Sequence, residues 1–213
     1  MKNKESIEHI LAALDKEFPE AILALKFSNP YECLVATILS AQCTDERVNQ
    51  VTPALFKKYP DARTMAKADL SELETDIKST GFFRNKAKNL MACAQALVER
   101  HDGKIPPSLD DMVKLPGVGR KTANMVLGAS YGIPGIIVDT HVTRVSQRLG
   151  LTKNKDAVKI EFDLNELIPR DRWTRFSNQL IWHGRTVCVA RKPKCDQCPL
   201  STWCDYYKET VAS

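Results

Sequence analysis

Four cysteines close to the C-terminus have the spacing of ligands to one metal centre. They form the pattern C-x6-C-x2-C-x5-C and are Cys188, Cys195, Cys198 and Cys204. Four thiolates bind a soft metal centre, and the spacing alone favours zinc, because short C-x2-C pairs are typical of zinc sites with four cysteine ligands. Disulfides are disfavoured, because we find no segment that resembles a secretion signal.

A glycine-rich segment followed by a lysine has residue types that could bind a phosphate and supply an amine. The segment is Leu115–Ala123, with the sequence LPGVGRKTA, and it lies between two helical patterns. Gly117 and Gly119 allow positive φ and close backbone approach, so several N–H groups can point together at the start of the next helix and bind an anion. If the anion is a DNA strand, such a turn contacts one phosphate without reading the base sequence. A bare G-x-G would indicate only a common turn between helices, whereas the full string is far more specific.

The basic residues are unevenly distributed along the chain. Lys and Arg outnumber Asp and Glu by 31 to 26, and the formal net charge of +5 does not by itself establish a nucleic-acid partner. Two segments, 113–131 and 183–194, carry basic residues and no acid, and together they could form one phosphate-facing surface. Two unrelated solvated faces are the alternative. The basic residues are Lys114, Arg120, Lys121, Arg185, Arg191, Lys192 and Lys194.

The elements that position these residues are predicted to be helices almost throughout, because apolar residues recur at helical spacing. Thr44 is predicted to cap the helix that follows it, and Gly81 and Gly132 to end two others. Only Ile136–Val138 reads as a short extended piece. Helices are expected at about 84–101, 140–149, 155–168 and 172–187.

The chain is therefore predicted to be all-α, and its 213 residues suggest one or two domains. The Gly and Pro residues around Gly132 indicate a domain boundary there. Cys33, Cys43 and Cys93 fall in helical patterns and are predicted to be buried small side chains. No apolar run approaches the ~20 residues that span a bilayer, so we expect no membrane partner.

These segments together resemble the helix-hairpin-helix DNA glycosylases, and the endonuclease III family in particular. Leu39–Asp45 (LSAQCTD), Leu115–Ala123, Val138–Val142 (VDTHV) and Arg191–Pro193 with its flanking cysteines occur in the family's order and cover nearly the whole chain. The resemblance implies a two-domain all-α fold with a C-terminal [4Fe-4S] cluster loop. Residues 21–132 should form the domain that contains the hairpin, and residues 1–20 plus 133–213 the cluster domain. It also replaces zinc by a [4Fe-4S] cluster on the four cysteines, since thiolates hold such clusters too.

The resemblance implies a bifunctional DNA N-glycosylase and AP lyase of base excision repair. Such an enzyme removes oxidised or ring-saturated pyrimidines from duplex DNA and cleaves 3′ to the abasic site by β-elimination. The family's nucleophile corresponds to Lys121, which would form a Schiff base with the sugar, and its catalytic carboxylate to Asp139, meeting Lys121 across a cleft. An ordinary lysine is protonated at neutral pH, so the site must favour the free amine. Taken alone, Lys121 would be a phosphate contact, and Asp139 before Thr140 a helix N-cap.

The same resemblance implies a DNA-binding surface, because a stacked base must be flipped out of the duplex before its sugar can be attacked. Gln42 and Phe82 correspond to the wedge that fills the gap. The family usually has Leu where this chain has Phe82, and ordinary core packing is the alternative for that side chain. The remaining DNA-binding positions are Gly117, Val118, Gly119, Arg120, His141, Arg191, Lys192 and Lys194, and the base pocket would include Ser40 and Asp45.

The expected partner is double-stranded DNA that contains damaged bases or abasic sites, bound by a monomer in the bacterial cytoplasm at the nucleoid. Two other hypotheses are open at this point. The first is an adenine glycosylase acting at mismatches, against which Lys121 and the lack of a further C-terminal recognition domain argue. The second is a non-catalytic DNA-binding module with a zinc ribbon.

Overall fold

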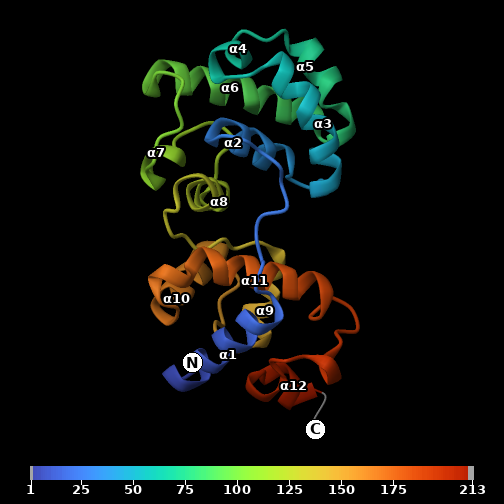
Figure 1. The fold of residues 1–213 in the computed structure, drawn as a ribbon, viewed down its shortest axis with the longest axis vertical. Coiled ribbons are helices and arrows are strands. Elements are labelled where there is room, and N and C mark those ends of the chain that lie inside the picture. Colours follow the sequence, from blue (N-terminus) through green and yellow to red (C-terminus); the bar gives the residue numbers. More distant parts are fainter. Residues whose placement is uncertain (1, 211–213) are drawn as a thin grey trace. The chain divides into compact units, whose positions relative to one another are not determined.

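The computed structural model describes residues 2–210 of the chain, which in that range is helical and contains no strand (Figure 1). The all-α prediction is confirmed. The α-helices are α1 (Lys4–Glu17), α2 (Pro30–Leu39), α3 (Asp45–Lys58), α4 (Ala62–Ala66), α5 (Leu70–Asp76), α6 (Phe83–His101), α7 (Leu109–Met112), α8 (Arg120–Tyr131), α9 (Thr140–Arg148), α10 (Ala157–Leu167), α11 (Trp173–Thr186) and α12 (Asp205–Thr210). Four 3-10 turns join them: η1 (Lys78–Thr80), η2 (Arg170–Arg172), η3 (Cys195–Gln197) and η4 (Ser201–Trp203).

The chain divides into two compact units. One comprises Ala24–Ile133, and the other comprises Met1–Leu23 together with Pro134–Ser213. We call them the hairpin unit and the cluster unit, after the segments that each contains, and describe each by itself. None of the helices in residues 2–210 is both long and apolar enough to cross a bilayer.

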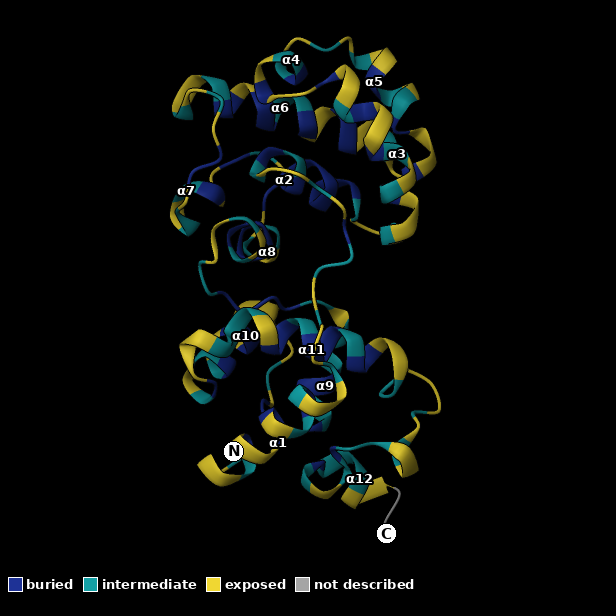
Figure 2. Cartoon of the chain, in the orientation of Figure 1, coloured by how far each residue is buried: buried dark blue, intermediate teal, exposed yellow. Residues whose placement is uncertain are grey.

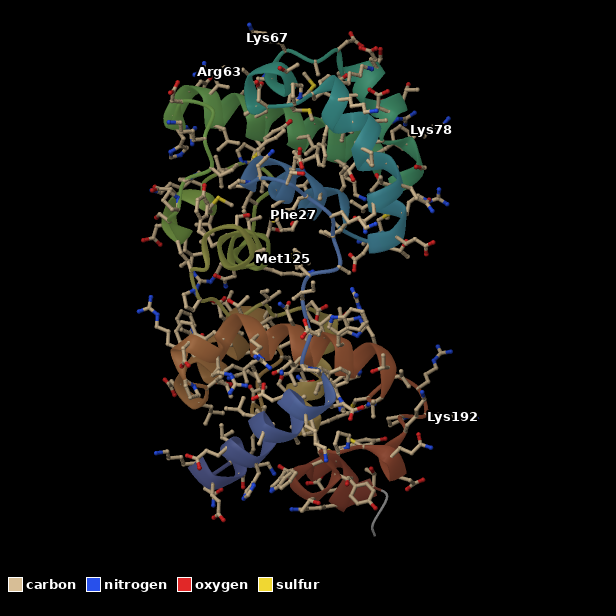
Figure 3. The ribbon with its side chains drawn as sticks, viewed as in Figure 1. Phe27, Arg63, Lys67, Lys78, Met125 and Lys192 are labelled. Atoms are coloured by element: carbon tan, nitrogen blue, oxygen red, sulfur yellow. The ribbon has the colours of Figure 1, made fainter. Side chains whose placement is uncertain are left out.

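Helix α2 is the core of the hairpin unit (Figure 2). Its residues Cys33–Leu39 are all buried, as expected for a helix that is apolar on every side. The helix begins where Asn29 Oδ1 accepts the N–H of Glu32 at 2.9 Å. It packs against α3, α6 and α8. At the α8 contact the Thr37 hydroxyl lies 3.7 Å from the sulfur of Met125, which is labelled in Figure 3.

Helix α11 has the corresponding place in the cluster unit, where it packs against α1 and α9. Phe176 and Leu180 are fully buried on its inner face. The segment before α9 is attached to the same helix through backbone N–H groups: Ile137 donates to Ser177 Oγ at 2.9 Å and Gly135 to Thr174 Oγ1 at 3.2 Å. The piece predicted as extended, Ile136–Val138, is therefore a buried connection without a strand partner in the part of the chain that the structure describes.

The sequence located most helix ends correctly. The helix expected at 84–101 is α6, Thr44 Oγ1 caps α3 by accepting the N–H of Arg47 at 3.2 Å, and Gly132 ends α8 with φ 65°. Cys33 and Cys93 are buried in helices, as predicted. The prediction for Cys43 was wrong: it lies in the turn between α2 and α3 and is partly exposed. The left-handed backbone of Gln42, with φ 53°, interrupts the helical pattern there.

Helices α9 and α11 approach each other closely at Gly184. A Cβ atom at that position would lie 2.9 Å from Cβ of His141 and 3.2 Å from Nη2 of Arg144. The contact sets the distance between α11 and the helix that begins after Asp139. Any side chain at Gly184 must therefore push α9 away.

We predict that Gly184→Ala lowers the free energy of unfolding by about 1–3 kcal/mol, the usual cost of overpacking, although alanine is the better helix former. Urea unfolding monitored by circular dichroism measures the change. Thr186→Ala, at an exposed position of the same helix, is the control and should stay within about 0.5 kcal/mol of the parent. A Gly184→Ala protein as stable as the parent would show that this contact does not fix the spacing of the two helices.

Candidate functional site

The hairpin between α7 and α8 requires glycine at Gly117. Its φ of 74° lies in the left-handed region, and an added Cβ would approach Cβ of Asn89 to 2.9 Å. Leu115 and Val118 are buried on either side of it, and the N–H of Val118 donates to the carbonyl of Leu115 at 3.1 Å. The turn is thus anchored by its two apolar residues while its glycines stay exposed.

The N-terminus of α8 has no side-chain cap and carries positively charged residues. Gly119 occupies the N-cap with φ −89° and ψ 173°, and it has no side chain to accept the first N–H groups of the helix. The first turn of α8 carries Arg120 and Lys121 and no acidic residue. The N–H groups at a helix N-terminus and the helix dipole both favour an anion at such an end. The side chain of Lys121 is exposed beside this position.

Asp139 is the N-cap of α9, as its place before Thr140 predicts. Its Oδ1 accepts the N–H of His141 and of Val142, both at 2.8 Å. These two bonds use one oxygen and leave Oδ2 outside the cap. The carboxylate is half-buried and follows the buried run Ile136–Val138. It is therefore held in one orientation by its own backbone and still has an oxygen to act on a ligand.

His141 is held next to this cap by Arg144. Nη2 of Arg144 lies 3.3 Å from Nδ1 of His141, and because a guanidinium can only donate, Nδ1 is the acceptor of this contact. Arg144 also donates to the carbonyls of Gly184 at 2.9 Å and Cys188 at 3.1 Å. Arg144 therefore links the first turn of α9 to the end of α11.

The four C-terminal cysteines line one cavity of the cluster unit. Cys188 follows α11, Cys195 begins η3, and Cys198 and Cys204 follow η3 and η4. Val145, Pro193, Tyr206 and Tyr207 also contribute to the wall. Between Lys2 and Thr210 no three His, Cys, Asp or Glu side chains are arranged to hold a single metal ion, so the thiols surround a space instead of meeting at a point.

The surroundings of the thiols suit a group that carries positive charge. Burial raises the pKa of the Cys198 thiol to about 11, so its thiolate needs a cationic centre to compensate for lost hydration. Nη1 of Arg148 lies 3.3 Å from Sγ of Cys188, and Nε2 of His183 lies 3.6 Å from Sγ of Cys198. Burial lowers the pKa of His183 to about 4, so its ring is neutral at physiological pH. The donor set is that of a thiolate-bound cluster, with a guanidinium N–H beside the sulfur of Cys188 and an imidazole nitrogen beside that of Cys198.

The loop between the first two cysteines carries exposed positive charge. Arg191, Lys192 and Lys194 are all exposed on it, and Lys192 is labelled in Figure 3. Arg148 holds the start of this loop by donating to the carbonyls of Val189 at 2.9 Å and Ala190 at 3.1 Å. The cations are therefore carried on a fixed backbone.

Gln42 and Phe82 are exposed residues of the hairpin unit, and both have a left-handed backbone. Their φ values are 53° and 47°, a conformation that costs energy for residues other than glycine. Phe82 is 63% exposed, so the alternative of core packing is wrong. Ser40 donates its hydroxyl to the carbonyl of Thr37 at 2.8 Å, and Asp45 is the first residue of α3 and half-buried.

Two family models match the chain. Residues 35–170 match the HhH-GPD superfamily of base excision DNA repair proteins, and residues 188–204 match the iron-sulfur binding domain of endonuclease III. Endonuclease III of Synechocystis sp. is 54% identical over 202 residues, which cover 94% of this chain and 92% of that protein. The chain belongs to the endonuclease III family. This assignment confirms the resemblance drawn from the motifs and sets aside the adenine glycosylase and the zinc module.

Other members of the endonuclease III family agree with this assignment. Endonuclease III of Bacillus subtilis is 46% identical over 205 residues, covering 96% of this chain and 94% of that protein. A solved non-covalent endonuclease III-DNA complex superposes with a TM-score of 0.94 at 42% identity and covers 100% of both chains. A trapped endonuclease III-DNA covalent intermediate gives 0.93 at 42% identity, covering 98% of this chain and 99% of that one.

The family assignment also decides the cofactor. The matched iron-sulfur domain runs from the first to the fourth of the C-terminal cysteines, and the chain carries a [4Fe-4S] cluster, as the resemblance predicted. The matched domain therefore shows that the zinc site, which the spacing alone favoured, is wrong. The spacing misled because zinc and iron-sulfur centres use the same thiolate ligands.

The predicted site residues of this endonuclease III family member divide between the two units. Gln42, Phe82, Ser40, Asp45 and the hairpin from Gly117 to Lys121 belong to the hairpin unit. The cluster unit contains the remaining ones, Asp139, His141, the four cysteines, Arg191, Lys192 and Lys194.

Sequence reasoning missed four residues that support the site: Lys86, Arg144, Arg148 and His183. A signal existed for Lys86, which shares a helical face with Leu90, Cys93 and Leu97, all of them buried. A lysine at such a core position needs hydrogen-bond partners. The other three residues are polar side chains of α9 and α11 whose partners lie from 15 to more than 40 residues away, and helical periodicity does not predict such pairs.

Proposed function

We propose that Lys121 and Asp139 perform the chemistry of base removal and strand cleavage. The chain is a DNA glycosylase and AP lyase of base excision repair, the activity of its family. The observation that supports the assignment of Lys121 is its exposed amine in the first turn of α8, directly after the hairpin that can bind a phosphate. A monofunctional glycosylase activates water and needs no amine at that place.

The reaction begins with rupture of the glycosidic bond, whose electron pair leaves with the base. Nζ of Lys121 bonds to C1′ and loses a proton, and the ring oxygen O4′ leaves C1′ as a hydroxyl, which gives an imine. The imine acidifies the C2′ proton. Loss of that proton breaks the C3′–O bond and expels the 3′ phosphate by β-elimination. Water then hydrolyses the imine and restores the lysine.

Asp139 would act on the same sugar in two ways. Its charge stabilises the positive sugar that develops as the base leaves, and its free Oδ2 can take the proton that the attacking amine releases. The cap on Oδ1 keeps the carboxylate fixed. A fixed dipole or charge aimed at developing charge is the arrangement that stabilises a transition state most.

The remaining assignments concern DNA. We place one phosphate on the hairpin of Gly117, Val118, Gly119 and Arg120, and others on His141, Arg191, Lys192 and Lys194. Gln42 and Phe82 enter the duplex as the wedge, and Ser40 and Asp45 line the pocket for the extruded base. Cys188, Cys195, Cys198 and Cys204 would hold the cluster, which when bound fixes the basic loop between its ligands.

Three properties stay predictions. The substrate is duplex DNA carrying oxidised or ring-saturated pyrimidines, the lesion class that the resemblance to endonuclease III implies. The protein acts as a monomer. It works in the bacterial cytoplasm at the nucleoid, since its substrate is chromosomal DNA and the relatives above are bacterial.

Borohydride trapping tests the proposed function. A duplex with thymine glycol is incubated with the full protein, once with borohydride and once without. We expect a covalent protein-DNA adduct with the reductant, and a strand cut on the 3′ side without it. Base release that leaves the strand intact and gives no adduct would identify a glycosylase without lyase activity and overturn the proposal. An undamaged duplex of the same sequence is the control.

A further inference from the structure

The buried lysine Lys86 is the least expected polar residue of the hairpin unit. It is 5% exposed and lies in the first turns of α6. Its Nζ donates to the carbonyl of Leu39 at 2.7 Å and to that of Thr80 at 2.8 Å. Both acceptors are main-chain oxygens, so the amine recognises backbone and no carboxylate.

The two carbonyls are the last of their helices. Leu39 ends α2 and Thr80 ends η1. The last carbonyls of a helix accept no hydrogen bond from an N–H group of the same helix. At the end of α2 a cation is also favoured by the helix dipole. Lys86 therefore joins the end of α2 to the end of η1, which lies 41 positions later in the sequence.

Each of these carbonyls lies shortly before one of the left-handed residues Gln42 and Phe82. Gln42 follows Leu39 by three positions, and Phe82 follows Thr80 by two. The backbone N–H of Lys86 also donates to the carbonyl of Phe82 at 3.1 Å. Lys86 thus contacts both turns, one through its amine alone and the other through its amine and its own backbone.

A lysine is a costly choice for this position if only stability matters. Burial lowers the pKa of Lys86, which records the cost of keeping the ammonium away from water. The neighbouring residues on the same helical face are Leu90, Cys93 and Leu97, and an apolar side chain would pack among them. An apolar side chain could not donate hydrogen bonds to the two carbonyls. The turns need such support, because a left-handed conformation of residues other than glycine persists only where the surrounding structure fixes it.

We propose that Lys86 is a positioning residue for base extrusion, which fixes the turns of Gln42 and Phe82 relative to each other. This inference rests on the wedge role of those two residues in the proposed function. Lys86 itself does not touch the sugar or the base. Its removal should weaken insertion into a duplex and leave the chemistry at Lys121 intact.

The test compares Lys86→Met with the parent on two substrates under single-turnover conditions. Base release from a thymine-glycol duplex should fall about 100-fold, the order expected for a misplacement of 1 Å. Strand cleavage at an abasic site in single-stranded DNA should be unchanged, because no base or duplex has to be displaced. Equal losses on both substrates, or none on either, would overturn the proposal.

Matched variants separate positioning from general damage to the fold. Lys88→Met, at an exposed position of the same helix, should behave like the parent on both substrates. Lys86→Arg keeps a charged donor and should recover part of the duplex activity. If the methionine variant does not fold, Lys86→Gln, which keeps an N–H donor on a shorter side chain, replaces it in the same two assays and should show a smaller loss that is confined to the duplex substrate.

Hydrogen exchange of the DNA-free protein distinguishes failure of this inference from failure of the wedge. In Lys86→Met the amides of residues 40–44 and 80–83 should exchange faster, and unchanged exchange there would show that Lys86 does not hold the turns. Gln42→Ala/Phe82→Ala tests the wedge by itself and should slow base release. In that background Lys86→Met should have no further effect, since the residues act as one unit. Additive losses would contradict a shared role.

Discussion

Lys121→Ala is expected to lose strand cleavage at a lesion by roughly 10³-fold or more, the scale of losing a catalytic nucleophile. Without the amine no imine can form, so the C2′ proton is not acidified and the 3′ phosphate is not expelled. Borohydride should then trap no adduct. Gel assays of nicking and trapping on a thymine-glycol duplex measure both losses.

The control for this prediction is Lys121→Arg, which keeps the positive charge beside the N-terminus of α8 and cannot form an imine. If Lys121 were only a phosphate contact, arginine would preserve strand cleavage. If it is the nucleophile, arginine should be as inactive as alanine while DNA binding, measured by anisotropy on an uncleaved duplex, is retained. Strand cleavage by either variant at the parental rate would contradict the assignment.

Asp139→Asn is expected to slow base release by about 10²- to 10⁴-fold, the range for a catalytic acid or base. Asparagine caps helices as well as aspartate, and its Oδ1 can accept the N–H groups of His141 and Val142 as the carboxylate does. The fold should therefore survive while the charge is lost. Single-turnover base release from a thymine-glycol duplex measures the rate, and thermal unfolding checks the fold.

The comparison with Asp139→Ala separates the two roles of the carboxylate. Alanine removes both charge and cap, so it should lower stability by about 1 kcal/mol in addition to the loss of activity. Asparagine should lower the activity alone. An Asp139→Asn enzyme with parental turnover would remove Asp139 from the catalytic machinery and leave it as a helix cap.

The parts of the fold that local chemistry determines could be predicted from the sequence. Thr44, Gly132 and Asp139 mark helix ends because a side-chain oxygen or a left-handed glycine is needed there, and all three do so in the structure. Gly117 is a stronger case. The sequence predicts one reason for glycine at this position, its positive φ. The second reason is that a Cβ would lie 2.9 Å from Cβ of Asn89, and this depends on how α6 packs against the hairpin.

The remaining features depend on contacts between distant segments. Cys43 follows an apolar helix, and only the turn around Gln42 takes it out of the helical pattern. The helical face that Lys86 shares with buried residues indicates that it is buried, but its two carbonyl partners can be identified only in the folded structure. The cysteine spacing identified a thiolate site without identifying its metal, because ligand type is common to zinc and iron-sulfur centres.

The most direct test of the central claim is the position of the covalent bond in the trapped adduct. Trypsin cuts after Arg120, and a modified Lys121 resists cleavage, so the adduct should appear by mass spectrometry on the peptide of residues 121–144. We predict that the reduced sugar is attached to Lys121. A sugar attached to another lysine or to the N-terminal amine, with Lys121 unmodified, would contradict the account.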